Sequence, residues 1–508
     1  MTFPLARRRL LTGAGALAAG AALAGCSPGN APGSSQGRRL RAAFSAGGSQ
    51  ETLDPHTAPL FIDQARAKAL YDSVLTYKDD MSVQARLAES WESDSSGSRW
   101  RVRLRDARFH DGRRVTAADV LWNYRRIADP ATGASAQQLF AGVDFSASRA
   151  SGRDLTLVLT AADFEFPAAL GAAGTEIVPK DTKDFDRPIG SGPFRYRSFR
   201  PGGSTLFTAW SDHWDGGPDI EELEFVPVND EQARLNALLS GQVHYAHDLS
   251  AASATRLAGR DGLRVLRTRL STMQAVLLRL NRAPFDDPRL VRAFTLGLDR
   301  DRLVEVALAG HGTAGNDLFG QGLRGYPAGL PARERDVDRA RALVEEAGAN
   351  GLTIALETSD ADPTWGNASS LIAGQLKDIG FKVTPHVRSA ATYFGEIKTK
   401  GVAAHSRTAT LPVTTHLRSR LRADAPNNLT GYDDPAFDRL LTQASATRDE
   451  KTRLDLLARA QHRARDRSGQ LVWAFSDWNI GHSGTLTGLR AAPPNSCDWA
   501  RFDRVRIS

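Results

Sequence analysis

The chain has 508 residues, of which 41% are hydrophobic and 24% charged, and its 65 Lys and Arg against 58 Asp and Glu give a net charge of +7. At roughly 150 residues per domain, this length allows about three domains with ordinary hydrophobic cores. The composition excludes a disordered chain, a collagen-like chain and a small disulfide-stapled scaffold, and the small positive excess argues against a nucleic-acid partner.

Residues 1–25 have the pattern of an export signal. Arg7–Arg9 precede a run rich in Ala, Gly and Leu that ends at Cys26, and this run is too short for a membrane-spanning helix. The Arg-Arg-Xaa-Leu-Leu start resembles the twin-arginine export motif, and residues 23–26 (Leu-Ala-Gly-Cys) resemble the bacterial lipobox. We therefore expect a cleaved signal peptide, a lipidated Cys26 and a flexible tether over residues 26–37, with twin-arginine and general secretory export both open.

Lipidation determines both the location of the protein and its disulfide chemistry. With Cys26 lipidated, Cys497 is the lone free thiol of the mature chain, because the sequence has two cysteines. No intramolecular disulfide is then possible, so stability must come from the size of the core. We expect an extracytoplasmic lipoprotein anchored to the outer face of the plasma membrane.

The first half of the body mixes helix and strand signals. Thr116-Ala-Ala-Asp119 is a capping box that predicts the start of a helix, and strands are expected at Leu155–Leu159 and Leu223–Val228. The segment Gly190–Phe194 lacks the lysine of a phosphate-binding loop and predicts a tight turn that enters a strand.

His244, His247 and Asp248 are closely spaced, as the ligands of a metal ion can be. The alternation of residues 242–246 predicts a short strand, in which positions 244 and 247 point to opposite faces. This pattern favours solvated or hydrogen-bonded histidines, and we expect no metal site there.

The second half continues the mixed pattern. Asp287 and Asp336 predict helix starts, the first of them followed by Pro288. Strand Leu352–Glu357, helix Ser369–Ile379 with Gly380 as its stop, and strand Phe381–Val387 predict a β-α-β unit, and further strands are expected at Ala275–Leu280 and Leu471–Phe475. Helix and strand alternate along the whole chain, so the fold class is α/β or α+β.

The sequence contains no His-Glu-x-x-His motif, no phosphate loop and no Cys-x-x-Cys pair. Gly481–Thr485 lacks the final glycine of the turn that carries a catalytic serine, and it predicts a turn. We expect no enzyme, no catalytic residue, no bound metal and no cofactor. An exported hydrolase or a transporter-free receptor remains the alternative of another class.

Several motifs in order carry a resemblance to a known family over nearly the whole mature chain. Thr52–His56 is similar to the "LDPH" element, Trp100–Val120 to "LRxGxxFHDGxxxTAxDV", Pro188–Phe194 to "PVGTGPY", and Ala237–Val243 to "ALxSGEID". Further matches lie at 70–75, 87–91, 280–300, 340–348 and 375–380. By these motifs the chain resembles the family 5 extracellular solute-binding proteins of ABC importers, the oligopeptide, dipeptide and nickel-binding group.

The resemblance implies an α/β fold of the type II periplasmic-binding-protein kind, a two-lobed clamshell with an inserted small α+β domain. We expect lobe I to comprise 38–58, 175–270 and 470–508, the insert domain 59–174, and lobe II 271–469. It also implies capture of a solute between the lobes, ABC permease and ATPase subunits as partners, and a monomer.

The residues implied for ligand binding lie in lobe II and near the end of the chain. In peptide-binding relatives a "WxADYxDP" segment supplies an Asp for the ligand ammonium and an aromatic residue. Arg407 stands near the aromatic position and Thr410 near the Asp position. His405 flanks them in the sequence, and Trp365 and Trp478 are candidates to stack on the ligand.

Thr410 and Arg407 leave the ligand open. A hydroxyl cannot replace the charge partner of a buried ammonium, and a neighbouring arginine would repel one. The guanidinium instead suits a carboxylate or phosphate, or it serves a surface salt bridge. The open alternatives are a peptide in another register, an anionic or metal-chelate ligand, and an oligosaccharide or other solute.

Overall fold

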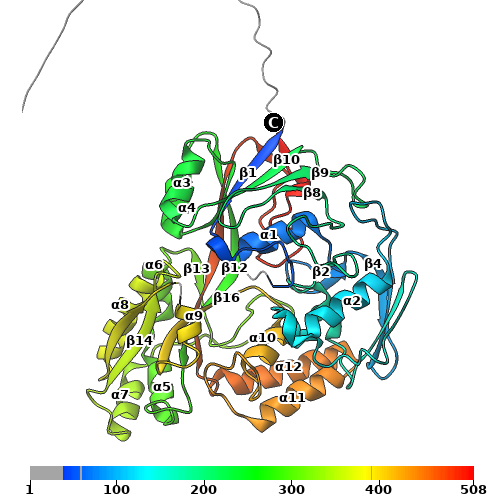
Figure 1. The fold of residues 1–508 in the computed structure, drawn as a ribbon. Coiled ribbons are helices and arrows are strands. Elements are labelled where there is room, and N and C mark those ends of the chain that lie inside the picture. Colours follow the sequence, from blue (N-terminus) through cyan, green and yellow to red (C-terminus); the bar gives the residue numbers. More distant parts are fainter. Residues whose placement is uncertain (1–37, 58–59, 391) are drawn as a thin grey trace, which may run out of the picture. The chain divides into compact units, whose positions relative to one another are not determined.

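The computed structural model describes residues 38–57, 60–390 and 392–508, and its described part is built around a mixed sheet of eleven strands (Figure 1). The order across the sheet is β15, β14, β16, β12, β17, β11, β1, β10, β9, β8, with β13 also paired to β17. The strands are β1 (Arg39–Phe44), β8 (Phe194–Ser198), β9 (Thr205–Ala209), β10 (Glu222–Pro227), β11 (Tyr245–Leu249), β12 (Leu263–Leu278), β13 (Gly312–Ala314), β14 (Thr353–Ser359), β15 (Lys382–Arg388), β16 (Ala403–Ala409) and β17 (Gln470–Ser483).

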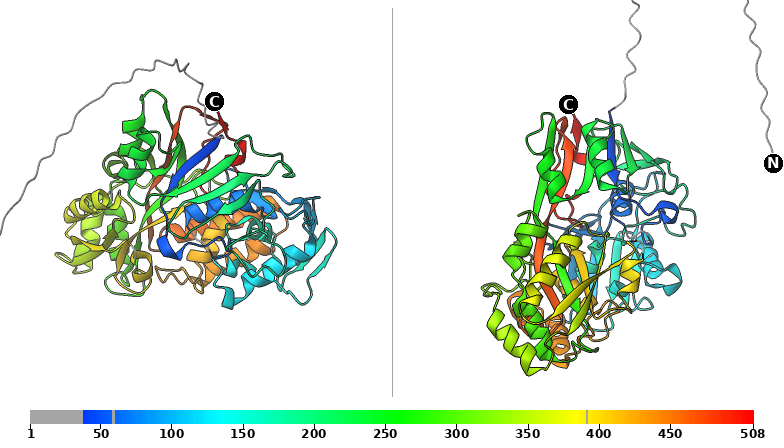
Figure 2. Two further views of the ribbon diagram at one scale, coloured as in Figure 1. Left: turned by 45° about the horizontal axis from the view of Figure 1, so that its top comes forward. Right: turned by 90° about the vertical axis from the view of Figure 1, so that its left-hand side faces the viewer.

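Two long strands, β12 and β17, join the two halves of this sheet. The first part of β12, Leu263–Thr268, pairs with β17 where β17 also pairs with β11, and its last part, Thr272–Leu278, pairs with β16. The pairing between β12 and β17 shifts between Thr268 and Thr272, where Leu270 has φ = 56°. The orange-red β17 can be followed from one half to the other in Figure 2. The interruption separates the part of β12 that lies beside the β11 pairing from the part that pairs with β16.

We call the half that contains β11, β1, β10, β9 and β8 lobe I, and the half that contains β15, β14 and β16 lobe II. Helices α3 (Glu231–Leu239) and α4 (Ala251–Leu257) pack on lobe I through an apolar cluster that includes Leu235, Leu238 and Leu257. Helix α1 (Phe61–Leu70) packs into the cluster formed by β1, β10 and the C-terminal segment. The apolar side of α1 joins this core, and its residues fall inside the range 59–174 predicted for the insert domain.

The other half carries β15, β14 and β16 and is covered by helices. Its elements confirm the predicted β-α-β unit, since β14 and β15 are parallel and α8 lies between them in the chain. Helix α8 begins one turn earlier than predicted, at Trp365, and Gly380 follows it with φ = 100°. The helices are α5 (Pro288–Gly297), α6 (Arg300–Ala307), α7 (Val337–Glu346), α8 (Trp365–Lys377), α9 (Tyr393–Glu396), α10 (Val413–Arg420), α11 (Pro435–Ala446) and α12 (Glu450–Arg465).

A separate small sheet lies between α1 and β8 in the chain. Its order is β4, β5, β7, β6, and it packs with α2 around a core that runs from Val74 to Ile177. Its elements, together with the β2–β3 hairpin, are β2 (Leu75–Tyr77), β3 (Val83–Ala85), β4 (Ala88–Ser93), β5 (Arg99–Leu104), α2 (Ala117–Ala128), β6 (Arg149–Ser151) and β7 (Asp154–Val158). This sheet and helix form the inserted α+β unit.

The predicted helix starts are confirmed in detail. Thr116 accepts a hydrogen bond from the backbone of Asp119, and the Asp119 carboxylate accepts one from the backbone of Thr116, so the capping box is complete. Asp287 and Asp336 likewise cap α5 and α7. The remaining short elements are β18 (Leu486–Thr487), β19 (Arg506–Ile507) and the 3-10 turns Gly48–Gln50, Pro130–Thr132, Gln137–Phe140, Phe166–Gly171 and Phe502–Arg504.

The expected turn at residues 190–194 is a bend that enters β8 at Phe194, as predicted. Gly192 N donates to the carbonyl oxygen of Leu70, the last residue of α1. This close approach of two backbones fixes α1 against lobe I. In the described ranges, no helix combines the length and the apolar character that crossing a bilayer requires.

Candidate functional site

A group of three charged side chains bridges the two halves of the large sheet. Arg407 of β16 donates from Nη1 to Asp362 Oδ2 at 3.2 Å, and its Nη2 lies 3.5 Å from Asp248 Oδ2. Asp362 lies in the loop between β14 and α8, and Asp248 lies in β11 of lobe I. The side chains of Arg407 and Asp248 remain 25% and 31% exposed. A salt bridge between the lobes thus borders a region that solvent reaches.

A bulge in β11 explains why Asp248 reaches across. The pairing of β11 with β17 shifts between Ala246 and Leu249, and Asp248 has φ = 52°. Asp tolerates this left-handed backbone better than most residues, and a bulge redirects a side chain that strict alternation would point elsewhere. The bulge directs the carboxylate toward Arg407.

The two carboxylates differ in their surroundings. Asp362 accepts hydrogen bonds from Thr364 N at 2.9 Å, Thr364 Oγ1 at 2.6 Å and Gln274 Nε2 at 3.0 Å, as well as from Arg407. Burial would raise the pKa of Asp362, but the charge of Arg407 and these hydrogen bonds lower it below its ordinary value. Burial raises the pKa of Asp248, and Arg407 opposes that rise without cancelling it. Asp362 is therefore held by several short hydrogen bonds, whereas Asp248 is held by Arg407 at a longer distance.

An aromatic cluster lies next to Asp248. His247, its neighbour in β11, packs edge-on against Trp478 and Trp499 with ring centroids 5.1 and 5.6 Å away, and Phe61 of α1 lies 5.0 Å from Trp478. Burial holds the pKa of His247 well below its ordinary value, so this imidazole is neutral. His247 Nε2, Trp478 Nε1 and Trp499 Nε1 are buried without a hydrogen-bond partner among the described residues. Such atoms are where water or a ligand is expected.

Trp365 and His405 lie side by side behind the charged group. Their rings stack at 5.5 Å, and both side chains are fully buried. Trp365 Nε1 donates to Gln274 Oε1 at 2.9 Å, and His405 Nε2 lies 3.0 Å from Ser369 Oγ. Burial lowers the pKa of His405 to about 4. The two rings form a rigid support for Gln274, which in turn holds Asp362.

Of the other residues predicted for the site, Thr410 directly follows β16 and contacts β12. Thr410 Oγ1 donates to the carbonyl oxygen of Ser271 at 2.8 Å, and the Thr410 carbonyl accepts from Asn495 Nδ2 at 2.7 Å. Its hydroxyl therefore ties β12 to lobe II. Trp478 belongs to the aromatic cluster. The structure brings Arg407 and Trp478 to the boundary between the lobes and puts Thr410, His405 and Trp365 behind it.

His244 and His247 occupy different environments. His244 Nδ1 accepts from the backbone N–H of Arg41 at 3.0 Å, whereas His247 lies in the aromatic cluster. Strand β11 begins at Tyr245, three residues after the predicted start. Within the residues that the structure describes, no three His, Cys, Asp or Glu side chains are grouped as a metal site requires.

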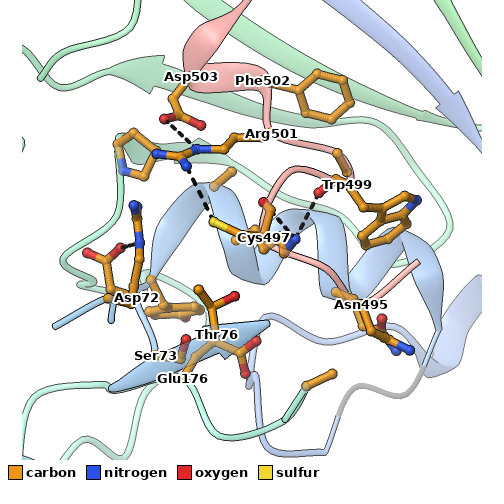
Figure 3. A pocket seen from close by; sticks show the side chains of 18 of the residues that line it. Asp72, Ser73, Thr76, Glu176, Asn495, Cys497, Trp499, Arg501, Phe502 and Asp503 are labelled. Atoms are coloured by element: carbon orange, nitrogen blue, oxygen red, sulfur yellow. Dashed lines mark hydrogen bonds and ion pairs between the residues drawn. The ribbon is translucent and has the colours of Figure 1, made fainter. Parts of the chain in front are cut away.

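A small chamber lies behind α1 (Figure 3). Cys497 Sγ accepts from Arg501 Nη1 at 3.3 Å, and Lys68 Nζ donates to the carbonyl oxygens of Cys497 and Trp499 at 3.2 and 2.8 Å. The chamber offers ≈ 60 Å³ to water-sized molecules. Since about 10–15 Å³ of such volume accommodates one water, the chamber has room for a few waters and is too small for a peptide.

The insert domain closes against lobe II through a second charged group. Glu165 accepts from Arg324 Nη1 and Nη2 at 3.1 Å each and from Arg453 Nε at 2.7 Å. Arg418 pairs with Asp163 at 2.7 Å next to it. A cavity of ≈ 290 Å³ lies beside these pairs, lined by Trp91 and other residues of both units. These ion pairs hold the insert domain against lobe II.

Sequence reasoning missed Asp248 as a partner of Arg407, and it missed Asp362, Gln274 and Phe61 entirely. Asp248 appeared only as a metal ligand candidate. Nothing in the spacing of these residues links them, because they come from β11, β12, β16, α1 and the loop before α8, which the fold brings together.

The comparisons with known proteins indicate the same kind of fold as the structure shows. Residues 82–416 match the family described as "Bacterial extracellular solute-binding proteins, family 5 Middle". The chain is 26% identical over 490 residues to the glutathione-binding protein GsiB of Pectobacterium atrosepticum, with 89% of this chain and 92% of that protein covered. The periplasmic binding protein DppA of Helicobacter pylori, solved with the peptide STSA, superposes with a TM-score of 0.81 at 19% identity over 93% of this chain and 98% of that one. The binding protein AgaA, solved with agropinic acid and described as from A.tumefacien R10, superposes with a TM-score of 0.79 at 23% identity over 92% and 99%.

Proposed function

This chain belongs to the family 5 bacterial extracellular solute-binding proteins, and we propose from that premise that it captures a peptide-like solute between lobe I and lobe II. It is the substrate-binding component of an ABC importer, and its family works with permease and ATPase subunits. The family consists of solute-binding proteins, which are not enzymes, so we assign this chain no catalytic residue. Delivery of the solute to the permease completes the proposed role.

The contact of Arg407 with Asp248 is the observation that carries the proposal. The two residues belong to different lobes, and the lobes are joined by β12 and β17. A ligand bound at this point is enclosed when the lobes close, which removes its polar groups from water on all sides. The closed form then presents the permease with a surface that the open form lacks.

The relatives support a peptide-like ligand. One relative is named for glutathione, and the superposed DppA structure contains a tetrapeptide. Arg407 favours a second candidate, an anionic or metal-chelate ligand, because its guanidinium can hold a carboxylate or phosphate through two parallel hydrogen bonds. Both candidates place the anionic part of the ligand at Arg407.

Arg407→Ala tests this assignment. We expect peptides to raise the unfolding midpoint of the wild-type protein, because a ligand that binds the folded state at 100 times its Kd adds about 2.7 kcal/mol to the free energy of unfolding. In the variant the same ligand concentration should add only about 0.3–1.3 kcal/mol, since the ligand loses a charged hydrogen bond worth about 1.5–3 kcal/mol. The measurement is thermal unfolding with panels of peptides, metal chelates and oligosaccharides.

Arg267→Ala is the matched control for that experiment. Arg267 pairs with Asp477 and its side chain is 41% exposed, so its loss should leave the peptide-induced rise intact. Unchanged ligand shifts in Arg407→Ala would remove Arg407 from the site. A response to chelates alone would replace the peptide by the second candidate.

We also propose that the protein is held at the membrane through Cys26, which lies outside the described residues together with the signal, the tether and the twin-arginine motif. Cys26→Ser should abolish incorporation of a labelled fatty acid and release the protein into the soluble fraction, because serine provides no thiol for the lipid. Fractionation of cells that express either form measures this. Continued labelling of the variant would contradict the anchor, and Cys497→Ser serves as the control that should keep the label.

A further inference from the structure

The Asp248 carboxylate is poorly satisfied in comparison with its neighbour. The side-chain donor that the structure gives it is Arg407, at the long distance of 3.5 Å, whereas Asp362 accepts hydrogen bonds from Thr364, Gln274 and Arg407 at 2.6–3.2 Å. A half-exposed carboxylate with one long contact can exchange its partner at little cost. Asp362 cannot do so without breaking a connected network.

The backbone around Asp248 is shaped for this side chain. Regular pairing of β11 with β17 is broken at this residue, which has a positive φ of 52°. Bulges are found beside binding sites because they redirect a side chain, and an unusual backbone conformation at a cleft is a sign of function. Here the bulge brings a carboxylate of lobe I to face lobe II.

The electrostatic surroundings favour a cation. Asp248 and Asp362 carry two negative charges against the single charge of Arg407. Arg234 donates hydrogen bonds to the backbone oxygens of His247 and Asp248, and Glu231 accepts one from Ser250. The positive charge of Arg234 and the negative charge of Glu231 act in opposite directions on Asp248. Burial lowers the pKa of the neighbouring His247 well below its ordinary value, so its neutral imidazole adds no opposing charge.

We propose that Asp248 receives a cationic group of the solute, and that Arg407 exchanges Asp248 for the solute's anionic group when the solute binds. The solute is then a zwitterion with a free ammonium, such as an unblocked short peptide. This inference rests on the proposed function and deepens it. It also supplies the charge partner that Thr410 cannot provide, from the opposite lobe and from a position that the lobe II motif does not include.

Unblocked tripeptides and the same tripeptides with acetylated N-termini are the probes. For the wild-type protein, calorimetric titration should show tighter binding of the unblocked set by about 10- to 100-fold, the range that a hydrogen bond to a charged group provides. Asp248→Asn should bind both sets with the weaker affinity. Asparagine accepts the same left-handed backbone and has nearly the same shape, so the variant changes the charge alone.

Asp261→Asn is the control, because Asp261 is exposed in the turn before β12 and should leave the ratio between the two sets unchanged. The unfolding midpoint of each variant verifies its fold. Equal wild-type affinity for unblocked and acetylated peptides would overturn this inference while leaving the proposed function in place, and so would an unchanged preference in Asp248→Asn. Failure of every peptide of both sets to bind would overturn the peptide assignment and this inference with it.

Discussion

Replacing Gly190 with alanine is expected to cost more than about 4 kcal/mol of the free energy of unfolding, the range of severe core defects. A Cβ atom at this position would lie 1.8 Å from the carbonyl oxygen of Leu70 and 2.7 Å from its carbonyl carbon. Both partners are backbone, and both are held, because Gly190 O accepts from His110 N at 2.8 Å and Leu70 O accepts from Gly192 N at 2.9 Å. Neither side can move without separating α1 from lobe I.

Gly374→Ala is the matched control. Gly374 lies in α8 with no atom within 4 Å of a Cβ, so alanine there should stabilise the protein by about 0.5–1 kcal/mol through its higher helix propensity. Urea unfolding followed by circular dichroism measures both variants. If Gly190→Ala lost no more than about 1 kcal/mol, the contact between the Gly190 segment and α1 would not be as close as described.

Glu165→Ala is expected to weaken the contact between the insert domain and lobe II by about 3 kcal/mol, the cost of removing one partner from a buried ion pair. Arg453, whose side chain is 9% exposed, loses its hydrogen bond of 2.7 Å, and Arg324 loses two of 3.1 Å. Ligand affinity should fall as well, because the apparent Kd rises as the population of the closed form falls. Small-angle scattering and peptide titration measure the two effects.

The pH dependence of this contact tests Glu165 and its two arginine partners a second time. Burial would raise the pKa of Glu165, but the hydrogen bond and charges of Arg324 and Arg453 lower it below its ordinary value of 4.5. The stabilisation is therefore fully present above pH 4.5 and is lost as the pH falls through the lower folded-state pKa. Glu450→Ala is the control, since Glu450 is 61% exposed and its pair with Arg324 should contribute at most about 1 kcal/mol. Equal effects of the two variants would show that Glu165 does not hold the insert domain against lobe II.

Local signals predicted much of the fold. The caps at Thr116, Asp287 and Asp336 and the β-α-β unit depend on residues that are neighbours in the sequence, so one chain was enough to find them. The strand predicted at Ala275–Leu280 covers only the buried end of β12, because the first part of β12 carries Arg264, Arg267 and Arg269 and lacks an apolar pattern. Long strands that cross between lobes cannot be found from periodicity alone.

The site could be predicted in part. Arg407 was predicted from its place near the aromatic position of the family segment, and in the structure it contacts Asp248. Asp248 could not be assigned to it, because its direction depends on a bulge that pairing with β17 creates. Asp362 reaches Arg407 from a loop 45 positions away in the sequence. Such contacts arise from packing between distant segments, which a single sequence does not record.

The path of β17 has a consequence for how the protein is made. Residues 470–483 pair with both β11 and β12, and these partners precede them by about two hundred positions or more. During synthesis, the edges of β11 and β12 that pair with β17 stay unpaired until this last strand emerges. Such unpaired edges can pair with other chains. Assembly of both lobes is therefore a late and slow event governed by long-range contacts. A cell that exports this protein would need to shield the unfinished sheet until its C-terminal strand arrives.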